Sequence, residues 1–256
     1  MFSAKVTLLH VVDLTTTGFE LVVRPLQEAE EDRQVVAREK LSSFLEREFP
    51  VVNSKRLVAA GDAATQIAEI ARERRFDLIV MPTHAGVFRR TLLGSTTAKV
   101  LNDADCPVLT TQHAETISPR PLEHQEWVCA LGLQAESERV LRFASQTAEA
   151  VHANLALIHA ISTSEPGVAV QLDLDERVQS AERLAARNRI EELQRRVGSN
   201  APVRIAVGPV KDALTEAARR LRADVLMIGR SPQAGVRLRD LTYAVVRDAP
   251  CPVLSV

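Results

Sequence analysis

The stretch DLIVMPTH at residues 77–84 decides the fold, because a short apolar run is followed directly by a polar turn. The run Leu78 to Met81 is too short for a helix and apolar at every position, which is typical of a strand buried on both faces of a parallel sheet. The same pattern returns as DVLMIGRS at residues 224–231, at an offset of 147. The chain therefore contains an internal repeat.

Two further anchors fix the order of the repeat. CPVLT at 106–110 recurs as CPVLS at 251–255, and LLHV at 8–11 recurs as LIHA at 157–160. Between the apolar runs lie stretches with helical periodicity, at 26–49, 63–75, 138–152, 176–197 and 211–222. Alternating strands and helices predict the α/β class, with a doubly wound parallel-sheet sandwich in each repeat.

The repeat also predicts the domain boundaries. With 256 residues, two domains are expected. We place them at 1–112 and 125–256, joined by a linker at 113–124 that contains the turn-forming sequence SPRP. Before LIHA the second repeat has an extra strand, 127–131, and a helix, whereas the first repeat begins at what should be its second strand. The first unit is therefore expected to lack its first strand and helix.

Composition excludes several classes of function. The 32 Lys and Arg are dispersed among 33 acidic residues, so the charge pattern gives no support to a nucleic-acid or membrane-surface role. Residues 1–5, MFSAK, lack the pattern of a signal peptide, and no apolar run reaches the roughly 20 residues of a membrane span. We expect a cytoplasmic protein, with its three cysteines reduced and packed rather than redox-active.

The order of these segments resembles the universal stress protein family. The resemblance is carried by DLIVMPTH (77–84), LLGSTTAKVL (92–101) and CPVL (106–109) in the first repeat, and it covers nearly the whole chain. It implies an adenine nucleotide alpha-hydrolase-like fold with a five-stranded parallel sheet per unit. It also implies that two units pair through their last strands, here within one chain, and a homodimer is a further expectation.

The resemblance implies a nucleotide motif that this chain keeps only in part. The ATP-binding branch of the family has Gly, two residues, Gly, nine residues, then Gly-Ser or Gly-Thr. Here Pro82 and Ala85 replace the first two glycines, only eight residues separate Ala85 from Gly94, and Gly94-Ser95 is intact. A glycine lets backbone approach a ligand closely, and a helix that begins at Ser95 can hold phosphate with its first amides.

The implied ligand is ATP or AMP, with Mg²⁺ as a potential companion, bound in the first repeat. The candidate residues are Val12 on the adenine side and, on the phosphate side, Thr83, His84, Gly94, Ser95 and Thr96. No catalytic or metal-binding residues are expected, because the chain has no Walker motif, no Ser-His-Asp arrangement and no carboxylate cluster.

The second repeat is not expected to bind ATP. Gly132 stands where the family has its adenine-binding Asp, and the corresponding position of the first repeat would precede Met1. Gly229 to Pro232 replaces the glycine pair, and Arg239-Asp240 stands where Gly94-Ser95 does. An Asp at the start of a helix would cap the amides itself and repel phosphate.

Several residues have a structural interpretation beside the functional one. Gly94 to Thr96 suits a turn and helix cap as well as a phosphate site. His84 could contact phosphate or serve only as a hydrogen-bonding loop residue. The cations at Arg89-Arg90 and Lys99 could neutralise phosphate or be solvated, and the matched His10 and His159 favour a structural role. Besides weak nucleotide binding, a ligand-free interaction module and a slow ATPase stay open.

Overall fold

The computed structural model describes residues 4–13, 26–50, 53–83, 93–111, 125–162, 172–230 and 236–256. By its internal contacts the chain divides into two compact units. One unit comprises Met1–Asp77 and Lys99–Cys106, and the other comprises Leu78–Ala98 and Pro107–Val256. The predicted boundaries at 112 and 125 follow the sequence repeat instead, and they stay a prediction; the predicted linker lies outside the described residues.

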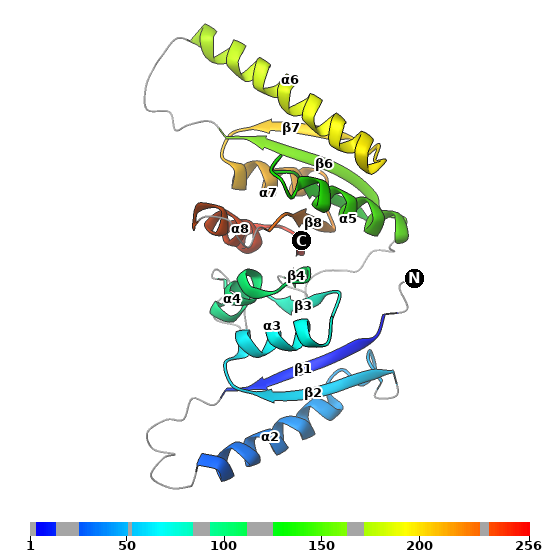
Figure 1. Ribbon diagram of the computed structural model, residues 1–256, viewed down its shortest axis with the longest axis vertical. Helices are drawn as coiled ribbons and strands as arrows, with labels where there is room; N and C mark the ends of the chain where they lie inside the picture. Colours follow the sequence, from blue (N-terminus) through cyan, green and yellow to red (C-terminus); the bar gives the residue numbers. More distant parts are fainter. Residues whose placement is uncertain are drawn as a thin grey trace. The chain divides into compact units, whose positions relative to one another are not determined.

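The first compact unit is built on two parallel strands, β1 (Val6–Val12) and β2 (Ser54–Ala60). Helices α2 (Leu26–Ser43) and α3 (Ala63–Glu73) pack on the pair from either side (Figure 1). In α3, alanines at helical spacing are buried, which is the amphipathic pattern expected at 63–75. Most of the strand side chains are only half-buried.

The second compact unit contains a seven-stranded sheet in the order β3-β4-β9-β8-β5-β6-β7. Its strands are β3 (Ile79–Pro82), β4 (Val108–Thr111), β5 (Glu126–Ala130), β6 (Asn154–Ile161), β7 (Val203–Val207), β8 (Val225–Ile228) and β9 (Val253–Ser255). Every neighbouring pair is parallel except β4 and β9. The α/β class predicted from the alternating pattern is confirmed.

The antiparallel pair β4 and β9 joins the last strands of the two repeats, as the family resemblance implies. Thr110 lies opposite Val253, and Val108 lies opposite Ser255. The buried Thr110 hydroxyl donates to the Val253 carbonyl at 3.2 Å. The two repeats therefore contribute to one continuous sheet.

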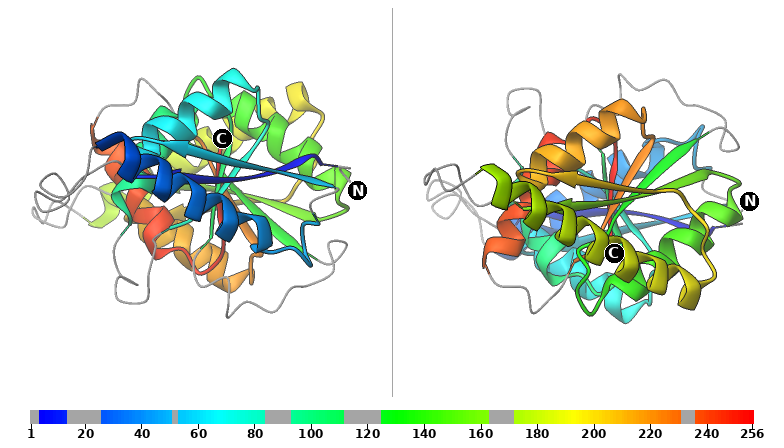
Figure 2. Two further views of the ribbon diagram at one scale, coloured as in Figure 1. Left: turned by 90° about the horizontal axis from the view of Figure 1, so that it is seen from below. Right: turned by 90° about the horizontal axis from the view of Figure 1, so that it is seen from above.

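Helices cover both faces of the sheet of the second compact unit. Helices α5 (Ser137–Ala150) and α6 (Leu172–Val197) pack together on one face, and α7 (Val210–Arg220) and α8 (Val236–Asp248) pack on the other (Figure 2). Helix α4 (Ser95–Asp103) begins in this unit and ends in the other. The core contains fully buried apolar side chains from strands and helices: Leu141, Leu157, Ile190, Leu226 and Met227.

The elements differ from the sequence expectations mainly at their ends. The helix expected over 26–49 ends at Ser43, and Leu45 just beyond it has a positive φ of 50°, which a continuing helix cannot contain. The helix expected from 176 begins at Leu172. The described part of the first repeat contains no counterpart of β5 or α5, in agreement with the strand and helix expected to be missing.

Candidate functional site

The candidate phosphate site is built where β3 ends and α4 begins. The Gly94 amide donates to the Thr83 carbonyl at 2.8 Å, which closes the connection between the strand and the helix. The buried Thr97 hydroxyl donates to the Pro82 carbonyl at 3.0 Å. These two bonds hold the first turn of α4 against the carboxyl end of the strand, where ligands bind in open parallel sheets.

The first amides of α4 have no partner within the helix. The Ala98 amide donates to the Gly94 carbonyl at 2.9 Å, so Gly94 is the capping residue of the helix. Glycine has no side chain with which to cap, and the amides of Ser95, Thr96 and Thr97 precede the helical ladder. Ser95 is exposed and Thr96 is half-buried. The arrangement offers partial positive charge and amide donors to an anion.

Thr83, a predicted ligand residue, lies at the end of β3 beside β4. It is only 2% exposed, and both its amide, at 3.0 Å, and its hydroxyl, at 3.4 Å, donate to the Thr111 carbonyl. The hydroxyl therefore faces the neighbouring strand β4. The predicted ligand residue His84 lies outside the described residues, as do Ala85 and the pair Arg89-Arg90.

Val12, the predicted adenine-side residue, lies at the end of β1 in the first compact unit. It is buried, and its carbonyl accepts the Gly61 amide at 3.0 Å. The second repeat has the same bond between Ile161 and Gly208, at 2.9 Å. Both glycines have φ above 120°, which favours glycine over other residues. The Val12 carbonyl thus holds the turn into α3.

That turn continues into a capped helix. Asp62 precedes α3, and its carboxylate accepts the Thr65 amide at 3.0 Å and the Thr65 hydroxyl at 2.7 Å. The Lys99 ammonium lies 3.3 Å from the same carboxylate. Thr65 and then Lys99 lower the pKa of Asp62 to about 2. Of the two interpretations of Lys99, the structure favours a structural ion pair over a contact with phosphate.

The lowered pKa of Asp62 predicts an acid-sensitive contribution to stability. A depressed carboxyl pKa stabilises the fold above its unfolded value, near 3.8, and the benefit is lost as pH falls towards about 2. Asp62→Asn should lower the melting temperature at pH 6 and narrow its difference from wild type at pH 2.5. Thermal melts at both pH values check this. Asp105→Asn, which removes an exposed carboxylate elsewhere, is the control, and an equal difference at the two pH values would contradict the expectation.

Comparison with known proteins identifies the family of the chain. The model of the universal stress protein family matches residues 1–112 and again 127–256. The chain belongs to the universal stress protein family. A universal stress protein of Methanothermobacter thermautotrophicus is 30% identical over 112 residues, which is 41% of this chain and 74% of that protein.

Solved structures of similar fold extend over the whole chain. A universal stress protein from Archaeoglobus fulgidus matches 98% of this chain and 85% of its own, with a TM-score of 0.64 and 20% identity. A protein of unknown function from Pseudomonas aeruginosa PAO1 matches 99% of this chain and 82% of its own, also with a TM-score of 0.64, at 21% identity. At such identities the likeness shows the fold alone.

The second repeat of this universal stress protein differs from the sequence expectation at its helix start. Helix α8 begins at Val236, so Arg239 and Asp240 lie inside the helix and not at its N-terminus. The expected capping role of Asp240 is therefore wrong. Helix α8 has 13 residues against 9 in α4, and the extra turn lies at its N-terminus, so the first amides of α8 precede Asp240 in the chain.

Two of the cysteines are packed in the core. Cys129 and Cys251 are buried, and burial raises the pKa of each thiol to about 12. Both are therefore neutral thiols at physiological pH and poor nucleophiles. This supports the packing interpretation.

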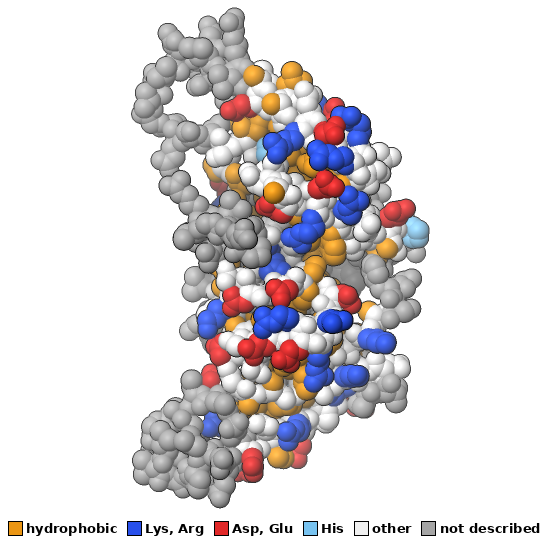
Figure 3. Space-filling view, in the orientation of Figure 1, with side chains coloured by type: hydrophobic (Ala, Val, Ile, Leu, Met, Phe, Trp, Pro, Cys, Tyr) orange, Lys and Arg blue, Asp and Glu red, His pale blue; other side chains and the backbone are white. Residues whose placement is uncertain are grey.

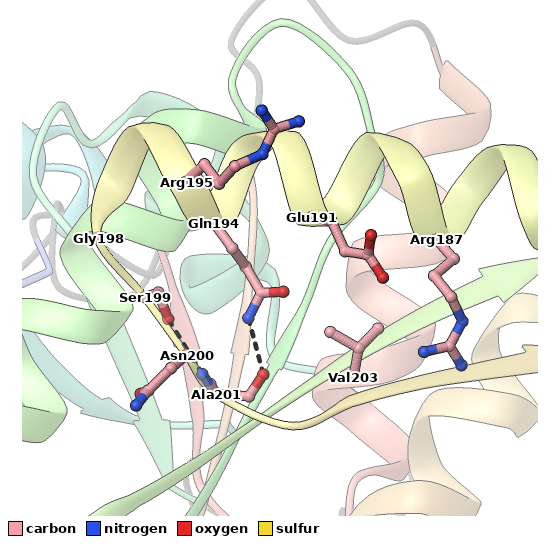
Figure 4. Close-up of a pocket in the computed structure, with 9 residues that line it drawn as sticks. All are labelled: Arg187, Glu191, Gln194, Arg195, Gly198, Ser199, Asn200, Ala201 and Val203. Atoms are coloured by element: carbon pink, nitrogen blue, oxygen red, sulfur yellow. Dashed lines mark hydrogen bonds between the residues drawn. The ribbon is translucent and has the colours of Figure 1, made fainter.

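A surface depression elsewhere in the second compact unit has a structural explanation. It lies where α6 ends and β7 begins, at the sheet edge opposite β3. Its lining consists of Arg187, Glu191, Gln194, Arg195, Gly198, Ser199, Asn200, Ala201 and Val203 (Figure 4). The Gln194 side-chain amide donates to the Ala201 carbonyl at 2.8 Å, which closes the turn between helix and strand. The Gln194 side chain therefore stabilises the connection between α6 and β7.

The described residues also show how charge and potential metal ligands are distributed (Figure 3). Basic and acidic side chains are interspersed over the described part of the face in Figure 3. Within the described ranges, no three or more His, Cys, Asp and Glu side chains lie together as metal ligands would. A search of the same residues found no helix with the length and apolar character needed to cross a membrane.

Proposed function

We propose that this universal stress protein binds the phosphate group of an adenine nucleotide, AMP or ATP, weakly at the start of α4 and does not turn it over. The observation that carries the proposal is the glycine cap at Gly94, which leaves the amides of Ser95, Thr96 and Thr97 at the positive end of a helix. The weak affinity follows from the adenine side, where the Val12 carbonyl already accepts the Gly61 amide.

Introducing an acidic cap tests the phosphate site. In Gly94→Asp the new carboxylate would accept the amides of the first turn and repel phosphate, so affinity should fall at least tenfold, which corresponds to about 1.4 kcal/mol. Isothermal titration calorimetry with AMP and with ATP, each with and without Mg²⁺, measures the effect.

Asn200→Asp is the matched control for this variant, because it adds the same charge at an exposed position beside β7, at the other edge of the sheet. It should bind like wild type. Equal affinities of wild type and Gly94→Asp would contradict a phosphate site at α4, and so would the absence of any binding heat with both nucleotides.

A ligand-free interaction module is the second candidate, and two contacts favour it. The Val12 carbonyl is engaged by Gly61, and the Thr83 hydroxyl is engaged by Thr111. Both groups would be expected to face a nucleotide if the site were kept for one. Under this alternative, purified protein releases no nucleotide on denaturation, and calorimetry detects none binding.

Slow ATP hydrolysis is tested at the same helix. Ser95 is exposed and is the first residue of α4, so its hydroxyl lies at the helix end where we place the phosphate. We expect wild type and Ser95→Ala to show the same background release of phosphate from ATP. A turnover rate that falls in Ser95→Ala would instead favour an enzyme.

A further inference from the structure

Helices α4 and α8 are equivalent elements of the two repeats. TAKVLND at 97–103 aligns with TYAVVRD at 242–248, with the offset of 145 that also relates CPVLT to CPVLS. The equivalent residues Val100 and Val245 are both buried, at 0% and 1% exposure. Two positions earlier, Ala98 aligns with Tyr243, the one tyrosine of the chain. The two repeats therefore differ greatly in side-chain size at this position.

These two equivalent residues meet each other within the second compact unit. The partly buried Tyr243 hydroxyl donates to the Ala98 carbonyl at 3.1 Å. In the sheet of the same unit, Leu109 of β4 lies opposite its own equivalent, Leu254 of β9. Equivalent residues of paired units meet where a two-fold axis passes between them. An approximate two-fold axis therefore runs past both the strand pair and the helix contact.

The strand pair and the helix contact differ in what they can specify. Leucine meets leucine between β4 and β9, so the same contact would form between two copies of either repeat. Between α4 and α8, a pair of first repeats would place alanine against alanine, with no ring to fill the space. A pair of second repeats would place two tyrosine rings where one ring and one methyl group lie here. An unfilled space and an overfilled one both destabilise a packed contact.

The same contact reaches the first turn of α4. The Ala98 amide donates to the Gly94 carbonyl at 2.9 Å, and the Ala98 carbonyl accepts the Tyr243 hydroxyl. The Thr97 hydroxyl of this turn donates to the Pro82 carbonyl of β3. The turn is thus held by its own repeat through Thr97 and by the second repeat through Tyr243.

We propose that Ala98 and Tyr243 form a complementary pair that makes each repeat fit the other repeat and not a second copy of itself. The partner that fits the α4 side has a tyrosine at the equivalent position, and the partner that fits the α8 side has a small residue there. Specificity of this kind comes from contacts that favour one pairing and penalise the others. Tyr243 is therefore a specificity-determining residue of the pairing between the repeats.

Exchanging the two residues in the full chain tests the proposal. Ala98→Tyr places a tyrosine on both sides of the axis, as two second repeats would, and Tyr243→Ala places an alanine on both sides, as two first repeats would. Each variant should lower the melting temperature by roughly 3 °C or more. The double variant Ala98→Tyr/Tyr243→Ala again has one ring and one methyl group, so it should recover at least about half of the summed loss. Thermal melts followed by circular dichroism measure all four proteins.

Two further variants separate the fit of the ring from other effects. Tyr243→Phe keeps the ring and removes only the hydroxyl, so it should lower the melting temperature less than Tyr243→Ala does. Leu184→Ala truncates a side chain of α6 that is 60% exposed, and its effect should simply add to that of Ala98→Tyr, because it lies on another helix. If Ala98→Tyr does not fold, the double exchange is still expected to fold.

Three outcomes would overturn the proposal. In the first, Tyr243→Ala melts at the same temperature as wild type. In the second, the losses of the two single variants simply add in the double exchange, or the double exchange is unfolded. In the third, Leu184→Ala rescues Ala98→Tyr as well as Tyr243→Ala does, since the rescue would then not depend on the contact at the axis.

Discussion

Leu157→Ala is expected to lower the free energy of unfolding by about 2–5 kcal/mol, the range found when a fully buried leucine is truncated. Leu157 lies in β6, is 0% exposed and packs in the core with Trp127, Leu141 and Ile190. Removing three carbons there leaves a cavity that a well-packed interior fills only in part. Urea denaturation, followed by circular dichroism and by the fluorescence of Trp127, the one tryptophan of the chain, measures the loss.

The repeat provides a matched control for this truncation. Leu8 in β1 occupies the position of Leu157 but is only half-buried. Leu8→Ala should therefore cost clearly less than Leu157→Ala. Equal costs would mean that the first repeat buries its strands as well as the second does.

Val253→Pro is expected to be the most disruptive change to the sheet, with a cost of about 3 kcal/mol or more. Val253 is 1% exposed and lies in β9, between Thr110 of β4 and Leu226 of β8. Proline removes a main-chain donor from a strand with neighbours on both sides and adds a ring where a buried strand has no room.

The control for Val253→Pro is the same substitution at Val80, on the open edge of β3. Because no described strand pairs there, Val80→Pro should change the free energy of unfolding much less. The two variants are compared by urea denaturation under identical conditions. A cost at Val80 as large as that at Val253 would contradict the strand order.

Much of the fold could be predicted from local pattern. DLIVMPTH and CPVLT are apolar runs bounded by turn residues, and their recurrence at nearly constant offset fixes the strands. The repeat also predicted that the described part of the first half has no counterpart of β5 and α5. What failed were helix ends: the stop at Ser43 is followed by a left-handed Leu45, and α8 starts four residues before the Asp240 expected to cap it.

The candidate site was less predictable, because a residue type does not say where its polar atoms point. Thr83 was predicted to contact a ligand, and the sequence did not indicate that its hydroxyl also donates to the Thr111 carbonyl of the neighbouring strand. Lys99 was expected to meet either phosphate or water, and it pairs with Asp62, which is 37 residues away in sequence. The sequence did predict that a helix begins directly after Gly94. The structure places the first residue of α4 at Ser95.

The pairing of β4 with β9 gives the chain an evolutionary freedom that a two-fold homodimer lacks. In a homodimer every change at such a junction appears twice, because both strands come from one coding sequence. Here Thr110 and Ser255 are equivalent positions encoded separately, and they already differ: the Thr110 hydroxyl bonds to Val253, while the buried Ser255 hydroxyl has no partner among the described residues. Each half can accumulate substitutions independently, and dilution cannot separate the two strands because one chain carries both.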